Sequence, residues 1–234
     1  METLVNYCQE IGVALDYTAV SRLEKYMQLI IEWNNKINLT SITSRDEFIV
    51  KHFCDSLSLL GKIEITKGAS LIDIGTGAGF PAIPLLIARP DLNITMLDSL
   101  NKRMVFISEQ VLPSIELEAE VIHGRAEELS KTKQYREKYD FAVSRAVANL
   151  SALSEYCIPF VKIGGTFAAM KGPDCHDEIS SAENAIDILG GALSDVVSFE
   201  LPDGSGRSIA VIDKISATPA KYPRRGVKIN KSPL

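Results

Sequence analysis

Residues 71–81 read Leu-Ile-Asp-Ile-Gly-Thr-Gly-Ala-Gly-Phe-Pro, and this stretch decides the fold of the 234-residue chain. An apolar strand ends in three alternating glycines, and Pro81 stands where a helix begins. Glycine permits a tight strand-to-helix turn and lets backbone amides approach a ligand. Asp98 ends the next apolar run about 20 residues later, where a carboxylate can accept hydrogen bonds from both hydroxyls of a ribose. The pattern predicts a nucleotide-like cofactor.

The spacing of the glycines indicates which cofactor this is. Dinucleotide-binding loops follow GxGxxG, in which the third glycine lets the helix pack and its N-terminus hold a pyrophosphate. Here Gly75, Gly77 and Gly79 follow GxGxG, and the acid Asp73 comes just before them. This arrangement favours S-adenosylmethionine (SAM), which has no phosphate, over NAD. A purely structural glycine turn is the remaining alternative.

Short apolar runs alternate with helical stretches from this loop onward. Strands are predicted at residues 70–74, 93–97, 119–122, 141–144 and 166–170. Helices are predicted between them, at residues 81–88, 102–112, 148–160 and 174–189. Such a βαβ succession requires a parallel sheet covered on both faces. Two further apolar runs, 196–201 and 208–214, flank a turn at 202–206, which predicts a terminal antiparallel hairpin.

The residues before the loop predict a helical extension. Apolar side chains recur at helical spacing up to Asn34. Ser44, with Glu47 three positions later, fits a capping box that begins another helix ending near Leu60. We therefore expect an α/β class I SAM-dependent methyltransferase fold, Rossmann-like, with a seven-stranded, mostly parallel sheet. The predicted divisions are the helical N-terminal extension at 1–62, the SAM-binding domain at 63–214 and a basic C-terminal arm at 215–234.

The distribution of charge matters more than its total. With 25 Lys and Arg against 30 Asp and Glu, the formal net charge of −5 by itself argues against a nucleic-acid partner. However, residues 214–234 carry +6 and residues 1–213 carry −11. A basic arm on an acidic body can offer a local positive surface to RNA, and a solvated terminus is the alternative.

Other classes of protein lack support in the sequence. The four cysteines have no CxxC spacing, so neither a zinc site nor a disulfide framework is predicted. The longest unbroken apolar run, residues 83–88, is far shorter than the roughly 20 residues that span a bilayer. The first residues carry no basic targeting region. We expect a cytoplasmic monomer with no metal and no membrane contact.

Seven ordered motifs carry a specific resemblance. They are WNNKINLT (33–40), HFCDS (52–56), DIGTGAGFP (73–81), LDSLNKR (97–103), VSRA (143–146), MKG (170–172) and YPRRG (222–226). Together they resemble the RsmG (GidB) family over nearly the whole chain. These are bacterial methyltransferases that modify the N7 atom of a guanine in 16S ribosomal RNA. The resemblance implies SAM as cofactor and, as partner, 16S rRNA within the small ribosomal subunit or its precursor.

The resemblance also implies which residues hold the cofactor. The SAM contacts of the family fall at Gly75, Phe80, Ala126, Glu127 and Arg145. The glycine spacing and the acid at the end of the next strand predict two further cofactor contacts, Gly77 in the loop and Asp98 at the ribose. Residues that follow the third strand of such a sheet lie beside the adenine, which agrees with the implied contacts there.

Arg145 stands at the end of the fourth strand, which faces the transferable methyl group in this architecture. Methyltransferases of exocyclic amines have an Asn/Asp-Pro-Pro-aromatic motif here, whereas this chain has Ser144-Arg145. It also lacks the Pro-Cys pair of cytosine C5 chemistry. Guanine N7 loses no proton and needs no general base, so we expect direct in-line transfer aided by positioning. Arg145 would position the methionine carboxylate or guanine O6.

Polar and basic residues outside the loop complete the prediction. His52, Asp55 and Ser56 share one helix face, and we expect a hydrogen-bonded network that docks the extension near the cofactor; RNA contact and a catalytic triad are the alternatives. RNA-facing residues are predicted at Lys102, Arg103, Lys171, Tyr222, Arg224 and Arg225. The alternatives are a small-molecule methyltransferase, disfavoured by the basic arm, and a non-catalytic RNA-binding assembly factor, disfavoured by the intact glycine loop with Asp98.

Overall fold

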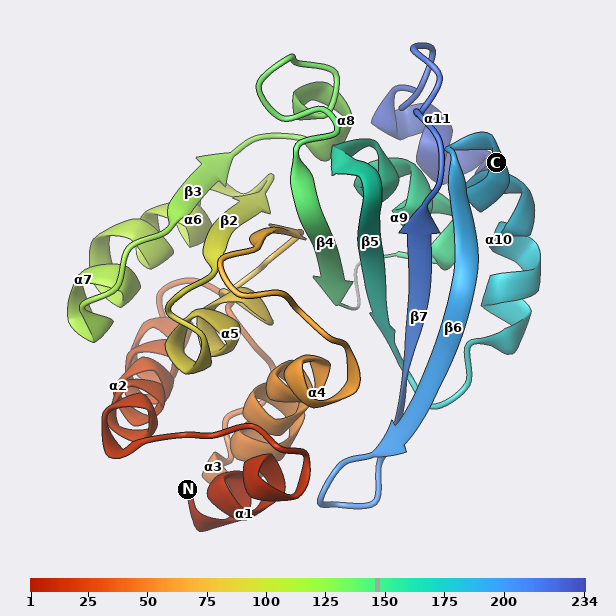
Figure 1. The fold of residues 1–234 in the computed structure, drawn as a ribbon. Coiled ribbons are helices and arrows are strands. Elements are labelled where there is room, and N and C mark those ends of the chain that lie inside the picture. The colour runs from red at the N-terminus through yellow and green to blue at the C-terminus, as the bar shows by residue number, and fades with distance from the viewer. Residues whose placement is uncertain (146–147) are drawn as a thin grey trace.

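The computed structural model describes residues 1–145 and 148–234, and in them one seven-stranded sheet forms the centre of the fold (Figure 1). The strands are β1 (Ser70–Ile74), β2 (Asn93–Asp98), β3 (Glu120–His123), β4 (Tyr139–Arg145), β5 (Val161–Lys171), β6 (Gly191–Glu200) and β7 (Gly206–Lys214). Their spatial order is β3-β2-β1-β4-β5-β7-β6. Strands β1 to β5 pair in parallel, and β7 pairs antiparallel with β5 and β6. The predicted α/β fold with a terminal hairpin is confirmed.

The helices of the described residues alternate with the strands as the sequence pattern predicts. They are α1 (Glu2–Glu10), α2 (Tyr17–Asn34), α3 (Arg45–Phe48), α4 (Asp55–Lys62), α5 (Ala82–Ala88), α6 (Asn101–Phe106), α7 (Leu112–Ile115), α8 (Ala126–Leu129), α9 (Leu150–Cys157), α10 (His176–Ile188) and α11 (Gly226–Lys231). Two π-helical segments, η1 (Ile49–Cys54) and η2 (Ile107–Val111), continue α3 into α4 and α6 into α7, and a short 3-10 turn, η3 (Ile158–Phe160), follows α9.

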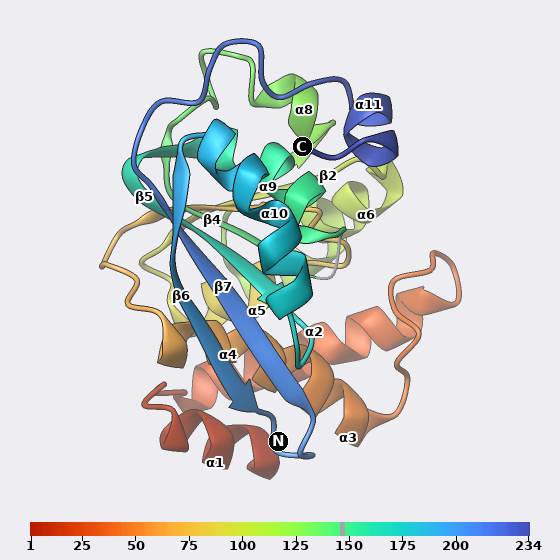
Figure 2. The same cartoon turned by 90° about the vertical axis from the view of Figure 1, so that its right-hand side faces the viewer.

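Each face of the sheet has its own apolar core. One core lies on the face covered by α5, α6 and the N-terminal helices, and the other on the face covered by α9 and α10. Strands β1, β2, β4, β5 and β7 contribute side chains to both cores. Figures 1 and 2 show α5 and α6 on one side of the sheet and α9 and α10 on the other. Burial on both faces explains why the central strands read as unbroken apolar runs. No helix in the part of the chain that the structure describes is long and apolar enough to span a membrane.

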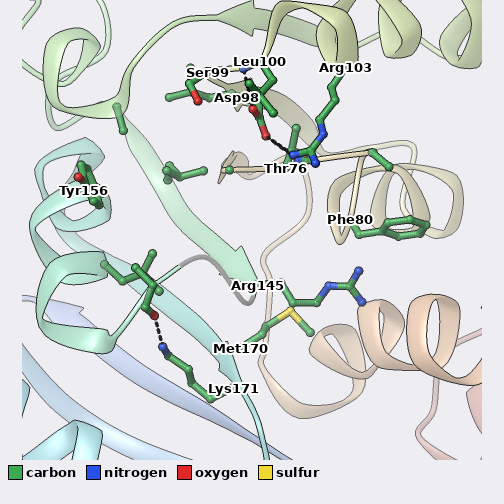
Figure 3. A pocket seen from close by; sticks show the side chains of 18 of the residues that line it. Thr76, Phe80, Asp98, Ser99, Leu100, Arg103, Arg145, Tyr156, Met170 and Lys171 are labelled. Carbon is green, nitrogen blue, oxygen red and sulfur yellow. Dashed lines mark hydrogen bonds and ion pairs between the residues drawn. The ribbon is translucent and has the colours of Figure 1, made fainter. Parts of the chain in front are cut away.

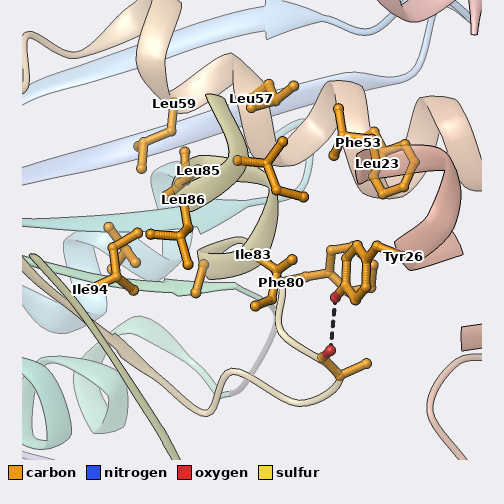
Figure 4. Packing of buried hydrophobic residues seen from close by; sticks show 14 of the residues in the cluster. Leu23, Tyr26, Phe53, Leu57, Leu59, Phe80, Ile83, Leu85, Leu86 and Ile94 are labelled. Atoms are coloured by element: carbon orange, nitrogen blue, oxygen red, sulfur yellow. Dashed lines mark hydrogen bonds between the residues drawn. The ribbon is translucent and has the colours of Figure 1, made fainter. Parts of the chain in front are cut away.

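The N-terminal extension packs directly behind the glycine loop (Figure 4). The Tyr26 hydroxyl of α2 donates a 2.8 Å hydrogen bond to the carbonyl of Ala78, between two glycines of the loop. Gly79 has a φ of +111°, and a Cβ there would lie 2.6 Å from Ile83 and 2.8 Å from the Tyr26 hydroxyl. The third glycine therefore lets the extension approach the loop closely. The extension supports the loop and is part of the same folded body.

Several element boundaries differ from the predicted ones; β6, for example, begins at Gly191, five residues before the predicted residue 196. Ser44 does precede α3, but its side chain caps no amide, and the Glu47 carboxylate instead pairs with Lys51 at 3.2 Å, so the predicted capping box is wrong. Strand β5 begins at Val161, five residues earlier than predicted, because Tyr139 on β4 provides a pairing partner that periodicity cannot reveal. The π-helical segments were not predicted either. Ala146, in the VSRA motif, lies outside the described residues.

Candidate active site

A cavity of about 1110 Å³ opens at the carboxyl ends of β1, β2, β4 and β5. In open α/β sheets this edge is where ligands bind. Figure 3 shows Asp98 and Arg103 on one side of it, Phe80 and Arg145 on another, and Tyr156 opposite. All seven residues predicted to hold the cofactor line the cavity: Gly75, Gly77, Phe80, Asp98, Ala126, Glu127 and Arg145. The structure therefore brings together residues that the sequence spreads over 71 positions.

The glycine loop and Asp98 form the centre of the cavity. Gly75 and Gly77 have positive φ values of 74° and 62°, which the turn after β1 requires. The Gly77 amide donates to Asp98 Oδ2 at 2.9 Å, and the Leu100 amide donates to Asp98 Oδ1 at 2.8 Å. The Arg103 guanidinium lies 3.7 Å from the same carboxylate. Because a carboxylate oxygen accepts more than one hydrogen bond, Asp98 keeps acceptor capacity for a ribose.

Asp73 lies behind the loop, away from the cavity lining. Its Oδ2 accepts from the Thr76 hydroxyl at 2.6 Å and from the Ala82 amide at 3.2 Å, which ties the strand end to the start of α5. The side chain is fully buried, and this burial raises the pKa of Asp73 to about 7. We therefore assign Asp73 to holding the shape of the loop.

The opposite end of the cavity is built by α8 and α9. Ala126 and Glu127 begin α8, and Glu127 is buried. Among the described residues, the cation that pairs with its carboxylate is Arg125, at 3.8 Å. Tyr156 and Leu153 of α9 add an aromatic and an apolar wall. Aromatic and apolar side chains with one carboxylate beside them suit an adenine ring and its amino group.

Arg145 is the centre of a polar network at the end of β4. Its guanidinium donates to Asp55 Oδ2 at 3.0 Å, to the Lys51 carbonyl at 3.1 Å and to His52 Nδ1 at 3.1 Å. It also lies over the Phe80 ring, 5.0 Å from its centroid. Arg207 of β7 donates to the other oxygen of Asp55 at 3.0 Å. One carboxylate from α4 therefore joins the ends of two strands.

The predicted network at the extension is confirmed for His52 and Asp55. Both side chains reach Arg145, and His52 stacks on Phe80 with 4.4 Å between ring centroids and 9° between planes. The hydroxyl of Ser56, on the same helix, is buried with no hydrogen-bond partner among the described residues. Ser56 therefore takes no part in the network, and no catalytic triad is formed here.

The tautomer of His52 follows from its partners. Arginine can only donate, so His52 Nδ1 accepts from Arg145 and the ring proton resides on Nε2. Nε2 then donates to the Thr40 hydroxyl at 2.8 Å. Thr40 belongs to the loop whose neighbours Leu39 and Ile42 line the cavity. His52 thus links Arg145 to the outer wall of the cavity, and only the neutral ring can do so.

This requirement predicts acid sensitivity. Burial, and then the Arg145 charge, lower the pKa of His52 from 6.5 to about 3. In the unfolded chain His52 takes up a proton near pH 6.5, whereas in the folded protein the ring stays neutral down to about pH 3. The contribution of the neutral ring to the free energy of unfolding is therefore present above pH 6.5 and is lost as the pH falls toward 3. Between about pH 6 and 4 the free energy of unfolding should fall more steeply than in His52→Asn, by at most about 1.4 kcal/mol per pH unit. Urea titrations measure both slopes, and parallel curves would contradict this.

The structure divides the six residues predicted to face RNA. Lys102 and Arg225 are exposed, and Arg103 is partly exposed at the cavity rim. The Lys171 amine is buried, donates to the Ala148 carbonyl at 2.6 Å and pairs with Glu178 at 2.8 Å.

The remaining two of these residues lie in the C-terminal segment. Tyr222 is only 7% exposed. The Arg224 guanidinium is held by the fully buried Glu155. Lys171, Tyr222 and Arg224 therefore have polar groups or ring faces that are used inside the protein, and their contact with RNA stays a prediction.

Three basic residues that line the cavity were missed from the sequence: Lys51, Arg125 and Arg207. Lys51 and Arg207 both line it, beside His52 and Asp55. Lys51 directly precedes the HFCDS motif (52–56), and this proximity is the signal that could have identified it. No sequence signal indicated Arg207, because its contact with Asp55 of α4 forms only in the folded protein. No group of three or more residues suited to a metal ion occurs in the described ranges.

The residues that line the cavity fit SAM. The loop has no Cβ at Gly75 or Gly77, Asp98 stands at the adjoining strand end, and the α8 end offers aromatic and apolar side chains with a carboxylate. A SAM-dependent methyltransferase from Aquifex aeolicus has the same fold, with a TM-score of 0.52 at 15% identity over 77% of this chain and 97% of that one. The cyclase SpnF also shares the fold, with a TM-score of 0.54 at 11% identity over 70% of this chain and 82% of that one. Fold and site together define a class I SAM-dependent methyltransferase.

Sequence comparison then narrows the class to one family. The model of the GidB family, rRNA small subunit methyltransferase G, matches residues 19–207, and the chain belongs to this family. It is 47% identical to ribosomal RNA small subunit methyltransferase G of Alkaliphilus metalliredigens, over 97% of this chain and 95% of that protein. It is 44% identical to the protein of the same name from Clostridium kluyveri, over 100% of this chain and 98% of that protein. The resemblance of the seven motifs to the RsmG (GidB) family is confirmed.

Proposed function

We propose that this protein transfers a methyl group from SAM to the N7 atom of a guanine in 16S rRNA of the small ribosomal subunit, in the bacterial cytoplasm. The names of its relatives support ribosomal RNA as the substrate. The cations at the cavity support a polyanion: Lys51, Arg103 and Arg207 line it, and Lys102 lies next to Arg103. Such side chains position RNA through its phosphates.

The observation that carries the choice of N7 is the state of the titratable groups near Arg145. His52 uses both ring nitrogens in hydrogen bonds, and its lowered pKa leaves it a poor base. Both oxygens of Asp55 accept from arginines. Amine or carbon methylation requires a proton to leave, and neither group is free to take it. Guanine N7 has a lone pair in the ring plane and loses no proton, so it suits this end of the cavity.

The residues would act by positioning. Asp98 would accept from the ribose hydroxyls, and Ala126 and Glu127 would border the adenine. Arg145 has five N–H donors, and its contacts with described residues account for three of them, so two remain for the methionine carboxylate or for guanine O6. When bound, SAM supplies a methyl group on a sulfonium that a lone pair can displace in line. Ordering two reactants in this way can contribute on the order of 7 kcal/mol.

The test is to incubate the protein with labelled SAM and small subunits from cells that lack it, and then to map the label. We expect one labelled guanine at which aniline cleaves the strand after borohydride reduction, as it does at an N7-methylated base. Label on an exocyclic amine would refute N7. Tight binding of SAM by a folded sample without any transfer to particles or to naked 16S rRNA would favour an assembly factor, and transfer to a small molecule would favour the other alternative.

A further inference from the structure

The C-terminal segment does not extend from the protein. After β7 the chain passes over the end of the sheet beside α8 and returns along α9 as α11 (Figure 2). We call residues 218–231 the C-terminal strap. Its first part is tied down by Arg136, whose guanidinium donates to the carbonyls of Thr218 at 2.7 Å, Pro219 at 3.3 Å and Tyr222 at 3.0 Å. One arginine thereby satisfies three backbone carbonyls of the strap.

A second anchor lies in the middle of the strap. Glu155 of α9 is fully buried and accepts from the Arg224 amide at 2.6 Å and from its guanidinium at 2.7 to 3.0 Å. Charge-assisted, multiply bonded pairs of this kind hold a fixed geometry. The strap is therefore a packed part of the methyltransferase domain, and α11 is brought to one place on its surface.

That place is the α8 end of the cavity. Gly226 begins α11 directly against Glu127, because a Cβ on Gly226 would lie 2.2 Å from Glu127 Oε1 and 3.5 Å from the Tyr156 hydroxyl. Asn230, one turn later, lines the cavity together with Tyr156. The Tyr156 hydroxyl donates to Asn230 Oδ1 at 3.2 Å. Gly226 and Asn230 of the strap therefore contact Glu127 of α8 and Tyr156 of α9, respectively.

We propose that the C-terminal strap completes the adenine end of the SAM site and that Asn230 binds the adenine ring. The inference rests on the proposed placement of adenine beside Ala126 and Glu127. Since Asn230 Oδ1 accepts from Tyr156, its two amide N–H groups remain as donors for a ring nitrogen. The Glu127 carboxylate accepts only, and it suits the exocyclic amino group. One donor and one acceptor at this edge match adenine and oppose hypoxanthine, which has a carbonyl in place of the amino group.

The first experiment measures the binding of S-adenosylhomocysteine, the demethylated product, by calorimetry. Asn230→Ala removes the amide and should weaken binding about three- to tenfold, the usual value of one hydrogen bond. Val227→Ala is the matched control, since Val227 lies on the same helix, is 69% exposed and carries no charge. Its dissociation constant should stay within about twofold of wild type. Melting temperatures confirm that each sample is folded.

Two further measurements separate an adenine contact from a general loosening of the strap. Wild type should prefer S-adenosylhomocysteine to S-inosylhomocysteine, and Asn230→Ala should reduce that preference, because a missing donor cannot discriminate. Gly226→Ala leaves every proposed cofactor contact in the sequence but forces Glu127 or α11 to move. It should also weaken binding.

The outcomes separate this inference from the proposed function. If wild type binds S-adenosylhomocysteine while folded Asn230→Ala and Gly226→Ala bind it equally well, the strap inference is overturned, and the mapping of labelled rRNA still decides the function. Unchanged cofactor affinity combined with weaker binding of Asn230→Ala to ribosomal particles would also overturn it and make the strap an RNA surface. Failure of wild type to bind the product would remove the cofactor site itself.

Discussion

Arg145→Ala should lower kcat/KM for methyl transfer about 100-fold, equivalent to about 2.7 kcal/mol of transition-state stabilisation. The guanidinium lies in the cavity at the end of β4, over Phe80, with donors left for the methionine carboxylate or guanine O6. The variant loses those donors and also leaves Asp55 with Arg207 as its remaining cation. A positioning role and a structural role therefore both predict a loss, and the design must tell them apart.

Arg145→Lys is the variant that separates the two roles. Lysine keeps the charge beside Asp55 but cannot reproduce the fork that contacts Asp55, His52 and the Lys51 carbonyl together. If positioning dominates, Arg145→Lys should retain near-normal stability in urea but remain about tenfold slow, with kcat affected more than the affinity for S-adenosylhomocysteine. Normal turnover and normal cofactor affinity in Arg145→Ala would refute the assignment.

The sequence predicted the sheet well because the informative residues are local. A glycine loop, the strand before it and the acid at the end of the next strand lie within 28 residues, and βαβ connectivity then leaves few topologies. The same local logic identified Asp98 and placed Arg145 at a strand end. These positions follow from chain order along the edge of a parallel sheet, so no tertiary contact had to be known.

Predictions that depended on partners far away in the sequence were less successful. Residues 214–234 carry a formal charge of +6, but a count of charges cannot tell whether a cation faces solvent or a buried carboxylate. Arg224 and Glu155 are 69 positions apart, and Lys171 is 23 positions from the carbonyl that it contacts. The network of Arg145 with Asp55 spans 90 positions. It was predicted only as a cluster on one helix, because its arginines come from β4 and β7.

In the folded protein the basic arm therefore has a different role from the one that its charge predicts. Its aromatic residue and one of its arginines hold the strap, while Arg225 faces solvent. The net charge available to RNA from residues 214–234 is smaller than +6, since Lys214 is buried with Glu137. Four cations of the terminus remain exposed: Lys221, Arg225, Lys228 and Lys231. Other cations, from η1, α6 and β7 among them, line the cavity. We infer that the terminus and the active-site rim both supply positive surface.

Arg224→Met should destabilise the protein by about 3–5 kcal/mol, the usual cost of leaving a buried charge without its partner. Glu155 is fully buried, and in the variant its carboxylate would retain only the amide of residue 224 as a donor from this pair. The loss is a large fraction of the roughly 5–15 kcal/mol that stabilises a typical domain. Urea denaturation followed by circular dichroism measures it, and a change below about 1 kcal/mol would refute the prediction.

The double variant Arg224→Met/Glu155→Gln provides the decisive comparison. Glutamine keeps an acceptor for the residue 224 amide but removes the charge, so most of the lost stability should return, since a neutral pair has little desolvation penalty. Arg225→Ala, which removes an exposed cation next to Arg224, is the matched control and should change stability by less than about 0.5 kcal/mol. If Arg224 instead served RNA, Arg224→Met would be stable, and its binding to particles would depend less steeply on salt. Recovery of stability in the double variant, with the salt dependence of particle binding unchanged from wild type, would place this arginine's role inside the fold.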